Sequence, residues 1–187
     1  MQKPYWWYVF YVRTNTEHRV VADMRRYFAF HRFPYEFDPF CPESEYYYRS
    51  REQRLLGRSY KRRPLFPGYV FLETNMPETE FLAKMSQYVY TSSDIIRILR
   101  YGETSKIALP DEERARLEFL LREKRCLEHS VGYIEGDDVI IDYGPLKGYE
   151  GLIVRIDRHN RVATLSLDIF GNKAQAKVAL EIVRKSR

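Results

Sequence analysis

The run Tyr5–Arg13 is the segment that most restricts how this chain can fold. Nearly all of its residues are aromatic or β-branched, a composition that favours a strand. Apolar residues occupy both its odd and its even positions, whereas successive side chains of a strand point to opposite faces. Both faces must therefore be covered. We predict that this run is the central strand of a sheet that is buried on both sides.

Three helices are predicted around this strand. Thr14 and Glu17 have the spacing of a capping box that opens a helix through about Arg32. Pro77 precedes a second helix, and Pro110 precedes a third that should run to about Arg125. Two pairs at four-residue spacing, Glu112/Arg116 and Glu118/Arg122, favour the third helix. The apolar positions of the first two helices are Val20, Val21, Met24, Tyr27, Phe28, Phe81, Leu82, Met85 and Val89. The run 95–101 should add another strand.

A long hairpin is predicted between the first two helices. The segment Tyr35–Arg49 looks extended, Gly57 is suited to a turn, and a return strand should end at Leu72. The stretch 49–63 could account for the whole net charge of +5, because its basic residues far outnumber its single acidic residue, Glu52. These basic residues are Arg49, Arg51, Arg54, Arg58, Lys61, Arg62 and Arg63.

This basic run has two interpretations, and the sequence favours neither over the other. Such a run is commonly a solvated face, or a device that keeps a sheet edge from pairing. Tyrosines flank it, however, at positions 46–48 and at Tyr60, and aromatic rings beside cations are suited to single-stranded nucleic acid. The second interpretation predicts that the hairpin contacts nucleic acid.

The composition changes near residue 126. The stretch 126–134 has no clear period, so we predict a linker there between a domain of residues 1–125 and a domain of residues 135–187. Short β-branched runs follow at 139–141, 152–156, 162–167, 176–179 and 181–183, separated by turn residues. That layout is typical of a small β-barrel. The predicted fold class is therefore α+β.

Several classes of protein are disfavoured by the sequence. No apolar run approaches a membrane span and no signal-peptide layout precedes Tyr5, so we expect a cytoplasmic protein with no membrane partner. Cys41 and Cys126 lie far apart and the histidines are scattered, so we expect two ordinary thiols and no metal site. No nucleophile-elbow, zinc-protease or dinucleotide motif occurs, so we expect neither an enzyme nor a cofactor.

Three segments in order resemble the NusG family of transcription factors. They are 7–9 (WYV) at the start of a strand that leads into a helix, 65–71 (LFPGYVF), and 136–139 (GDDV) followed by 144–146 (GPL) and Gly151. The last group, continued by 170–171 (FG), is similar to a KOW motif. The resemblance implies an N-terminal antiparallel sheet with flanking helices, joined to an SH3-like KOW barrel.

The resemblance also implies partners. The first domain of the family binds the clamp helices of RNA polymerase near the upstream fork of the transcription bubble, so our hypothesis is that the basic hairpin approaches DNA there. The resemblance implies that Tyr11, Phe66, Tyr69 and Phe71 contact the polymerase. Tyr69 and Phe71 share one face of a predicted strand, and aromatic side chains make good anchors. Core packing is the other explanation for these aromatic residues. We expect the chain to act as a monomer.

The predicted barrel carries dispersed basic residues that could contact RNA phosphates: Lys147, Arg155, Arg158, Arg161, Lys173 and Lys177. Residues 90–94 (YTSSD) and 170–174 (FGNKA) depart from the pattern of the general factor. These departures favour a specialised, LoaP-like antiterminator that reads a hairpin in nascent RNA. Two alternatives stay open: a general factor whose KOW domain binds protein partners, and a ribosome-associated RNA-binding protein.

Overall fold

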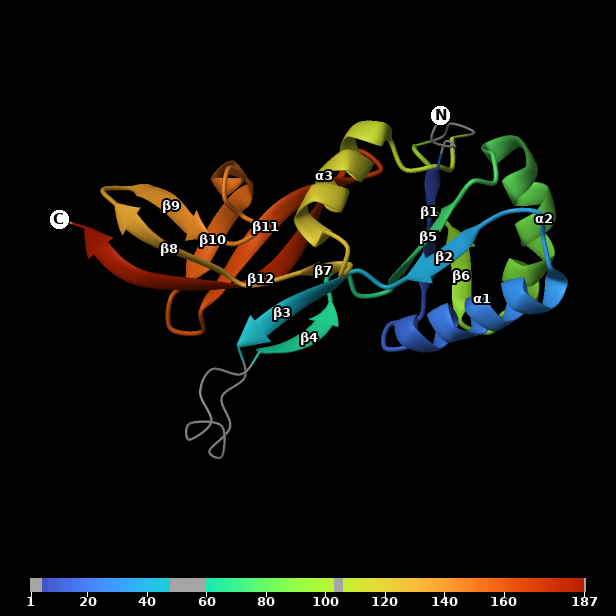
Figure 1. Cartoon of the computed structure of the whole chain (residues 1–187), viewed down its shortest axis with the longest axis horizontal. Coiled ribbons are helices and arrows are strands. Elements are labelled where there is room, and N and C mark those ends of the chain that lie inside the picture. Colours follow the sequence, from blue (N-terminus) through green and yellow to red (C-terminus); the bar gives the residue numbers. More distant parts are fainter. Residues whose placement is uncertain (1–4, 48–59, 103–105, 187) are drawn as a thin grey trace. The chain divides into compact units, whose positions relative to one another are not determined.

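The computed structural model describes residues 5–47, 60–102 and 106–186 (Figure 1). Its contacts group the chain into two compact units that alternate along the sequence. The first unit comprises Met1–Cys41, Pro67–Ala115 and Ile169–Asn172, and the second comprises Pro42–Phe66, Arg116–Asp168 and Lys173–Arg187.

The first unit is built on a four-stranded sheet in the order β2-β5-β1-β6. The strands are β2 (Phe37–Phe40), β5 (Tyr69–Thr74), β1 (Trp6–Val12) and β6 (Ile95–Ile98), and neighbouring strands are antiparallel. The four consecutive residues 7–10 of β1 are all completely buried. The prediction of an inner strand that is covered on both faces is confirmed.

Two helices pack their apolar stripes into the core of this unit (Figure 1). They are α1 (Glu17–His31) and α2 (Glu78–Thr91). Met24 of α1 and Met85 of α2 join one core cluster with Tyr8 of β1, and the rings of Tyr8 and Phe81 stack with centroids 3.5 Å apart. Both helices were predicted from these apolar positions.

The predicted capping box at the start of α1 is wrong. The residue before the helix is Thr16, whose hydroxyl donates to the Arg13 carbonyl oxygen rather than capping the helix. Glu17 is buried, and its Oε1 accepts the backbone N–H of Gly68 at 2.7 Å. The carboxylate therefore ties the helix to the turn before β5 instead of closing a local box.

The third helix, α3 (Asp111–Leu121), ends earlier than expected. Arg122 adopts a left-handed conformation with φ of 52°, which stops a helix of L-residues. Arg116 binds Asp168 at 3.1 Å, so its structural partner is not the residue four positions earlier.

The second unit contains a small sheet that is formed by segments distant in the sequence. Its order is β4-β3-β7, with β4 (Tyr60–Pro64), β3 (Glu43–Tyr47) and β7 (Cys126–Leu127). β3 and β4 form the arms of the predicted hairpin, while β2 and β5 pair in the other unit. The turn predicted at Gly57 lies outside the described residues.

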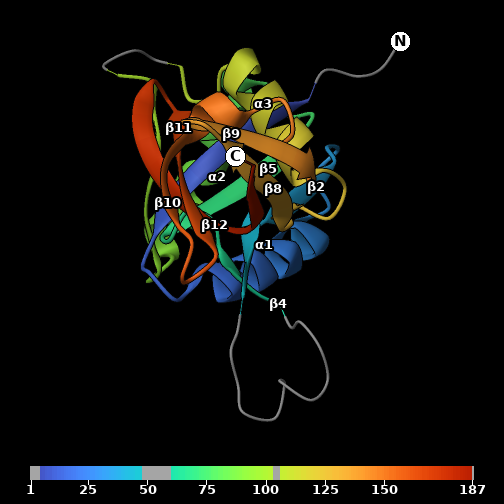
Figure 2. The ribbon, with the colours of Figure 1, turned by 90° about the vertical axis from the view of Figure 1, so that its left-hand side faces the viewer.

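The second sheet of this unit has five strands in the order β10-β11-β12-β8-β9 (Figure 2). They are β10 (Ile153–Asp157), β11 (Val162–Ile169), β12 (Asn172–Ser186), β8 (Ser130–Glu135) and β9 (Asp138–Tyr143), with a short helix η1 (Glu150–Leu152) before β10. The last two predicted runs form one strand, β12, which pairs in parallel with β8.

The order of these strands bears on the barrel and on the linker. Within the described ranges the pairing is an open series, so the closed barrel remains a prediction. The segment 126–134, predicted as a linker, carries β7 and most of β8. The domain limits 1–125 and 135–187 remain predictions.

Candidate polymerase and nucleic-acid interfaces

Tyr11 and Tyr69 form a cross-strand pair on the sheet of the first unit. They face each other in the register of β1 and β5, and their ring centroids are 5.7 Å apart. Both side chains are half-buried, and the guanidinium of Arg97 lies 5.9 Å from the Tyr11 ring. An aromatic pair that keeps an accessible part can anchor a protein partner.

Two other aromatic residues predicted to bind the polymerase are buried. Phe71 is completely buried, with its ring centroid 5.9 Å from Trp7 and 5.6 Å from Phe40. Phe66 is 2% exposed. In this conformation only Tyr11 and Tyr69 of the predicted set offer surface to a partner, and polymerase binding by all four stays a prediction.

The backbone before Tyr69 is fixed by Gly68. Its φ of +85° lies where a side chain is strained, and an added Cβ would come within 3.2 Å of the Tyr11 ring and of the Val12 carbonyl oxygen. The bond from Gly68 to Glu17 holds this turn in place. Sequence reasoning missed the role of Glu17 because the same residue fitted a capping box.

The basic hairpin is only partly described. Arg49, Arg51, Arg54 and Arg58 lie outside the described residues. Lys61 and Arg62 of β4 are exposed, whereas Arg63 is half-buried with its guanidinium 5.0 Å from the Tyr46 ring. The arms of the hairpin therefore place cations beside aromatic rings.

Two residues of the basic group predicted in the barrel, Arg161 and Lys177, lie beside this hairpin. The Arg161 guanidinium lies 4.6 Å from the Tyr47 ring and also pairs with Glu181 at 3.6 Å. Arg63 Nη2 donates to the Lys177 carbonyl oxygen at 3.4 Å. Two basic groups that the sequence kept apart thus meet within one compact unit.

The remaining residues of that group have other surroundings. Lys147, Arg155, Arg158 and Lys173 are exposed. Lys173 binds Asp168 at 2.8 Å, and this hydrogen bond lowers the pKa of the Asp168 carboxyl. No contact described for Arg155 or Arg158 draws them toward the hairpin.

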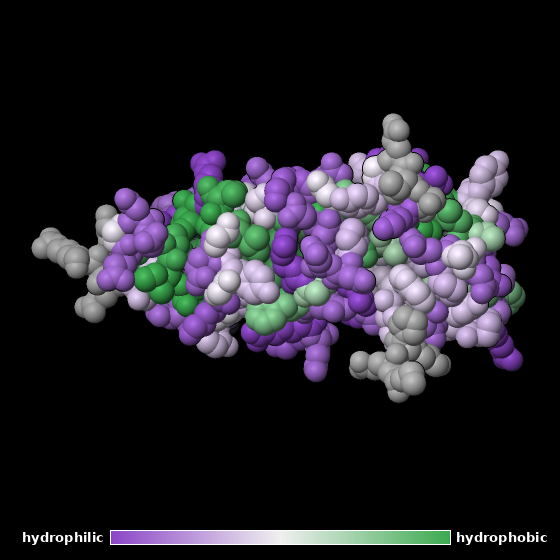
Figure 3. Space-filling model, turned by 90° about the horizontal axis from the view of Figure 1, so that it is seen from above, coloured by the Kyte–Doolittle hydropathy of each residue, from purple (hydrophilic) through white to green (hydrophobic). Residues whose placement is uncertain are grey.

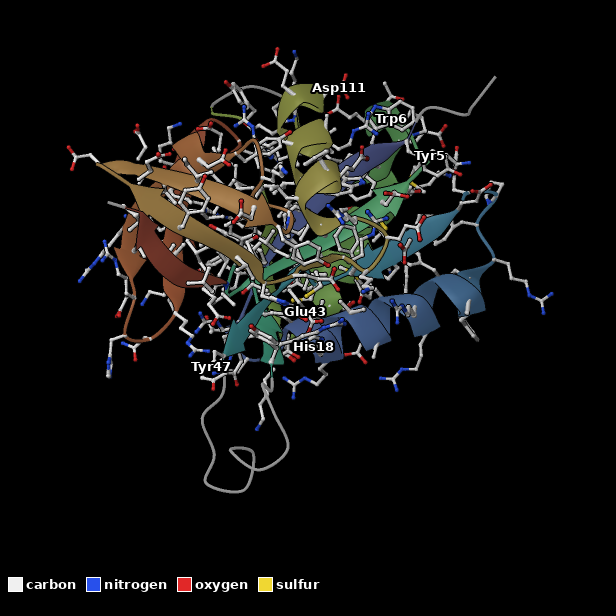
Figure 4. All side chains as sticks on the ribbon, turned by 60° about the vertical axis from the view of Figure 1, so that its left-hand side comes forward. Tyr5, Trp6, His18, Glu43, Tyr47 and Asp111 are labelled. Atoms are coloured by element: carbon white, nitrogen blue, oxygen red, sulfur yellow. The ribbon has the colours of Figure 1, made fainter. Side chains whose placement is uncertain are left out.

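An aromatic row continues from the hairpin to β9. Tyr47 and Tyr60 are opposite each other with centroids 6.1 Å apart, Tyr60 stacks on His129 at 4.2 Å, and His129 lies 6.4 Å from Tyr143. We call Tyr47, Tyr60, His129 and Tyr143 the aromatic row. Figure 4 labels Glu43 and Tyr47 at the two ends of β3. His129 and Tyr143 were missed because neither belongs to a periodic pattern.

A pocket of about 450 Å³ adjoins the far end of this row. Its aromatic and cationic lining comprises Phe119, His129, Tyr143, Arg122, Lys124 and Lys147. Glu128 also lines it and binds Lys124 at 2.5 Å, which holds the pKa of the Glu128 carboxyl below its usual value. Lys147 Nζ donates to the backbone carbonyl oxygen of Asp142 at 3.4 Å.

The fold and these surfaces define a class: an α+β protein with one unit built on a helix-flanked antiparallel sheet and a second, β-rich unit with an aromatic and basic surface. The family model described as "Transcription termination factor nusG" matches residues 5–118. This match covers more than half of the chain, which therefore belongs to the NusG family. Members of this family are transcription factors that interact with RNA polymerase, and they are not enzymes.

Individual relatives are similar over most of the chain. The transcription termination/antitermination protein NusG of Pasteurella multocida is 24% identical over 186 residues, covering 96% of this chain and 94% of its own. NusG of Thermus thermophilus is 27% identical over 127 residues, covering 67% and 69%. A solved structure described as domain interaction in Thermotoga maritima NusG shares the fold, with a TM-score of 0.54, 19% identity and coverage of 96% and 94%.

Two further observations concern membranes and cysteines. None of the helices in the described ranges has the length and apolar character needed to span a bilayer. Cys41 and Cys126 are both buried thiols. Burial raises the pKa of the Cys126 thiol to about 11.

Proposed function

We propose that this protein is a specialised transcription elongation and antitermination factor. It binds the clamp helices of RNA polymerase through the accessible surface of Tyr11 and Tyr69 and binds nascent RNA through its KOW domain. The observation that carries the polymerase contact is the half-buried Tyr11–Tyr69 pair, which lies inside the region matched by the NusG model. The proposal includes a cytoplasmic monomer and a closed KOW barrel.

Nucleic-acid binding is supported by the meeting of cations and aromatic rings in the second unit. Arg161 over Tyr47 and Arg63 over Tyr46 are cation–π arrangements whose rings and charges suit bases and phosphates. The specialised, LoaP-like role is supported by the departures at residues 90–94 and 170–174 from the general factor. The proposal includes a contact with upstream-fork DNA, which is supported by the exposure of Lys61 and Arg62 on β4.

The test is a reconstituted termination assay with the natural polymerase and templates with and without candidate leader hairpins. We expect readthrough to rise only when the leader hairpin is present. Substituting both Tyr11→Ala and Tyr69→Ala should abolish this rise. Phe30→Ala is the matched control, because Phe30 is 82% exposed and its substitution removes an aromatic ring outside the proposed surface. Readthrough that is unchanged on every template, while polymerase binding persists, would contradict antitermination.

A second candidate is a general NusG-like factor whose KOW domain binds a protein. Figure 3 shows apolar surface over the second unit. Val154 of this unit is 57% exposed. Exposed apolar surface is a common feature of protein-binding sites. Under this alternative, Val154→Asp would abolish the effect on transcription and leave RNA binding intact. Co-purification with ribosomes but not with polymerase would instead favour a ribosome-associated protein.

A further inference from the structure

We propose that the aromatic row and its adjoining pocket form one binding track for unpaired nucleotides of nascent RNA. The row runs from Tyr47 on the hairpin to Tyr143 on β9, and the pocket takes one nucleotide at its end. The hairpin and the KOW strands then act as a single RNA site instead of two independent ones. This inference rests on the proposed function for its choice of RNA.

The spacing of the rings suits a stacking surface. Successive centroids in the row are 6.1, 4.2 and 6.4 Å apart, so the rings make a nearly continuous aromatic path. Tyr60 and His129 are parallel within 8°, so each covers one face of the other, and the ring of Tyr143 offers a base the most accessible face of the row. All four side chains keep exposed surface, and Tyr143 is 67% exposed. Bases stack on such rings with little dependence on sequence, because every base has a flat face.

The middle of the row is held rigidly by Glu45. Its Oε2 accepts the backbone N–H of His129 at 2.9 Å and lies 2.8 Å from His129 Nδ1. The carboxylate thereby fixes the orientation of the imidazole against Tyr60. A ring that is already ordered loses little conformational freedom when a base stacks on it.

Positive charge follows the row at both ends. At the hairpin end, the guanidinium of Arg161 lies over Tyr47 and that of Arg63 lies over Tyr46. At the pocket end are Arg122 and Lys147, whereas the charge of Lys124 is paired with that of Glu128. Aromatic rings between cations are the arrangement that holds bases while phosphates are neutralised.

The pocket has the size and lining for one nucleotide. A volume of about 450 Å³ falls in the range of small-molecule sites. Phe119, His129 and Tyr143 supply rings for a base, and Arg122 and Lys147 supply charge for a phosphate. Two carboxylates also line the pocket, but Glu128 is bound to Lys124 and Asp142 is exposed to solvent.

The same features disfavour paired RNA as the ligand of the track. In a duplex the base faces are covered by their neighbours, whereas loops and single strands can place bases on aromatic side chains. The track therefore fits the loop or flank of a leader hairpin and not its stem.

The experiment measures fluorescence anisotropy of the full chain with three labelled probes: a short single-stranded RNA, the corresponding RNA duplex and a single-stranded DNA of the same sequence. We expect the single-stranded RNA to bind most tightly. Tyr143→Ala should weaken its binding about tenfold or more, and Tyr143→Phe should restore most of it, because a ring face remains. Phe30→Ala, which removes an exposed aromatic ring away from the track, should bind like the unmodified protein.

Charge and stacking can be separated by varying salt. Lys147→Ala should lower the salt dependence of RNA binding by about one phosphate contact, whereas Tyr143→Ala should leave that dependence unchanged. Duplex RNA binding as tightly as single strand, or Tyr143→Ala binding like the unmodified protein, would overturn the track. Tighter binding to the DNA probe would overturn the assignment to RNA. Because none of these measurements includes polymerase, they stay informative if the termination assay contradicts antitermination.

Discussion

The buried bond between Glu17 and Gly68 makes a prediction whose size follows from the structure. Glu17 is 2% exposed, and its carboxylate accepts the Gly68 N–H at 2.7 Å. Glu17→Ala removes this acceptor and leaves a buried donor unsatisfied, which should cost about 2–3 kcal/mol of unfolding free energy. Glu17→Gln keeps a carbonyl acceptor without the charge, so about 1 kcal/mol should be lost.

Thermal and urea unfolding followed by circular dichroism would measure this effect. For a chain of this size about 1 kcal/mol corresponds to roughly 2–4 °C, so Glu17→Ala should melt roughly 4–12 °C lower. Glu123→Ala is the matched control, since Glu123 is exposed, and it should melt within about 1 °C of the unmodified protein. Polymerase binding should weaken in Glu17→Ala because the released turn carries Tyr69. A Glu17→Ala protein as stable as the control would refute the reasoning.

Three further predictions concern other parts of the fold. Gly132→Ala should destabilise the second unit by about 2 kcal/mol or more in urea unfolding, because the new Cβ would lie 2.2 Å from a backbone carbonyl oxygen of β9. Gly151→Ala is the control and should cost little, because its Cβ would meet no atom within 4 Å; equal unfolding midpoints for the two variants would contradict the packing around Gly132. Glu113→Ala should lower the melting temperature, because the Glu113 carboxylate accepts the backbone N–H groups of residues 170 and 171 at 2.6 and 2.8 Å. An unchanged melting curve would show that these two hydrogen bonds do not stabilise the fold. Cys126, whose pKa burial raises to about 11, should resist iodoacetamide at pH 8 in the native protein and react after denaturation, and equal rates by mass spectrometry would argue against a buried thiol.

The elements were predictable where one local pattern determined them. Apolar residues at both parities required β1 to be an inner strand, and helical spacing identified the buried side of α1 at Val20 and Met24. Strand alternation also placed Tyr69 and Phe71 on one face. Alternation does not reveal how far a face is covered, however, and Phe71 is fully buried while Tyr69 keeps accessible surface.

The candidate sites were less predictable because they depend on distant contacts. Arg63 and the Lys177 carbonyl are separated by 114 positions, and no local period could bring them together. The same holds for the stack of Tyr60 on His129, which joins the hairpin to the segment predicted as a linker. Glu17 illustrates a different limit: a local capping bond and a bond to a remote turn demand the same residue type, and the remote one formed.

The central claim is tested most directly by the affinity of the purified natural polymerase for this protein, measured by biolayer interferometry. We predict that replacing both Tyr11 and Tyr69 by alanine weakens binding at least tenfold, as expected for an aromatic hot spot, in a variant that circular dichroism shows to be folded. The Phe30→Ala control should bind normally. Unchanged affinity of the folded double variant would contradict the account.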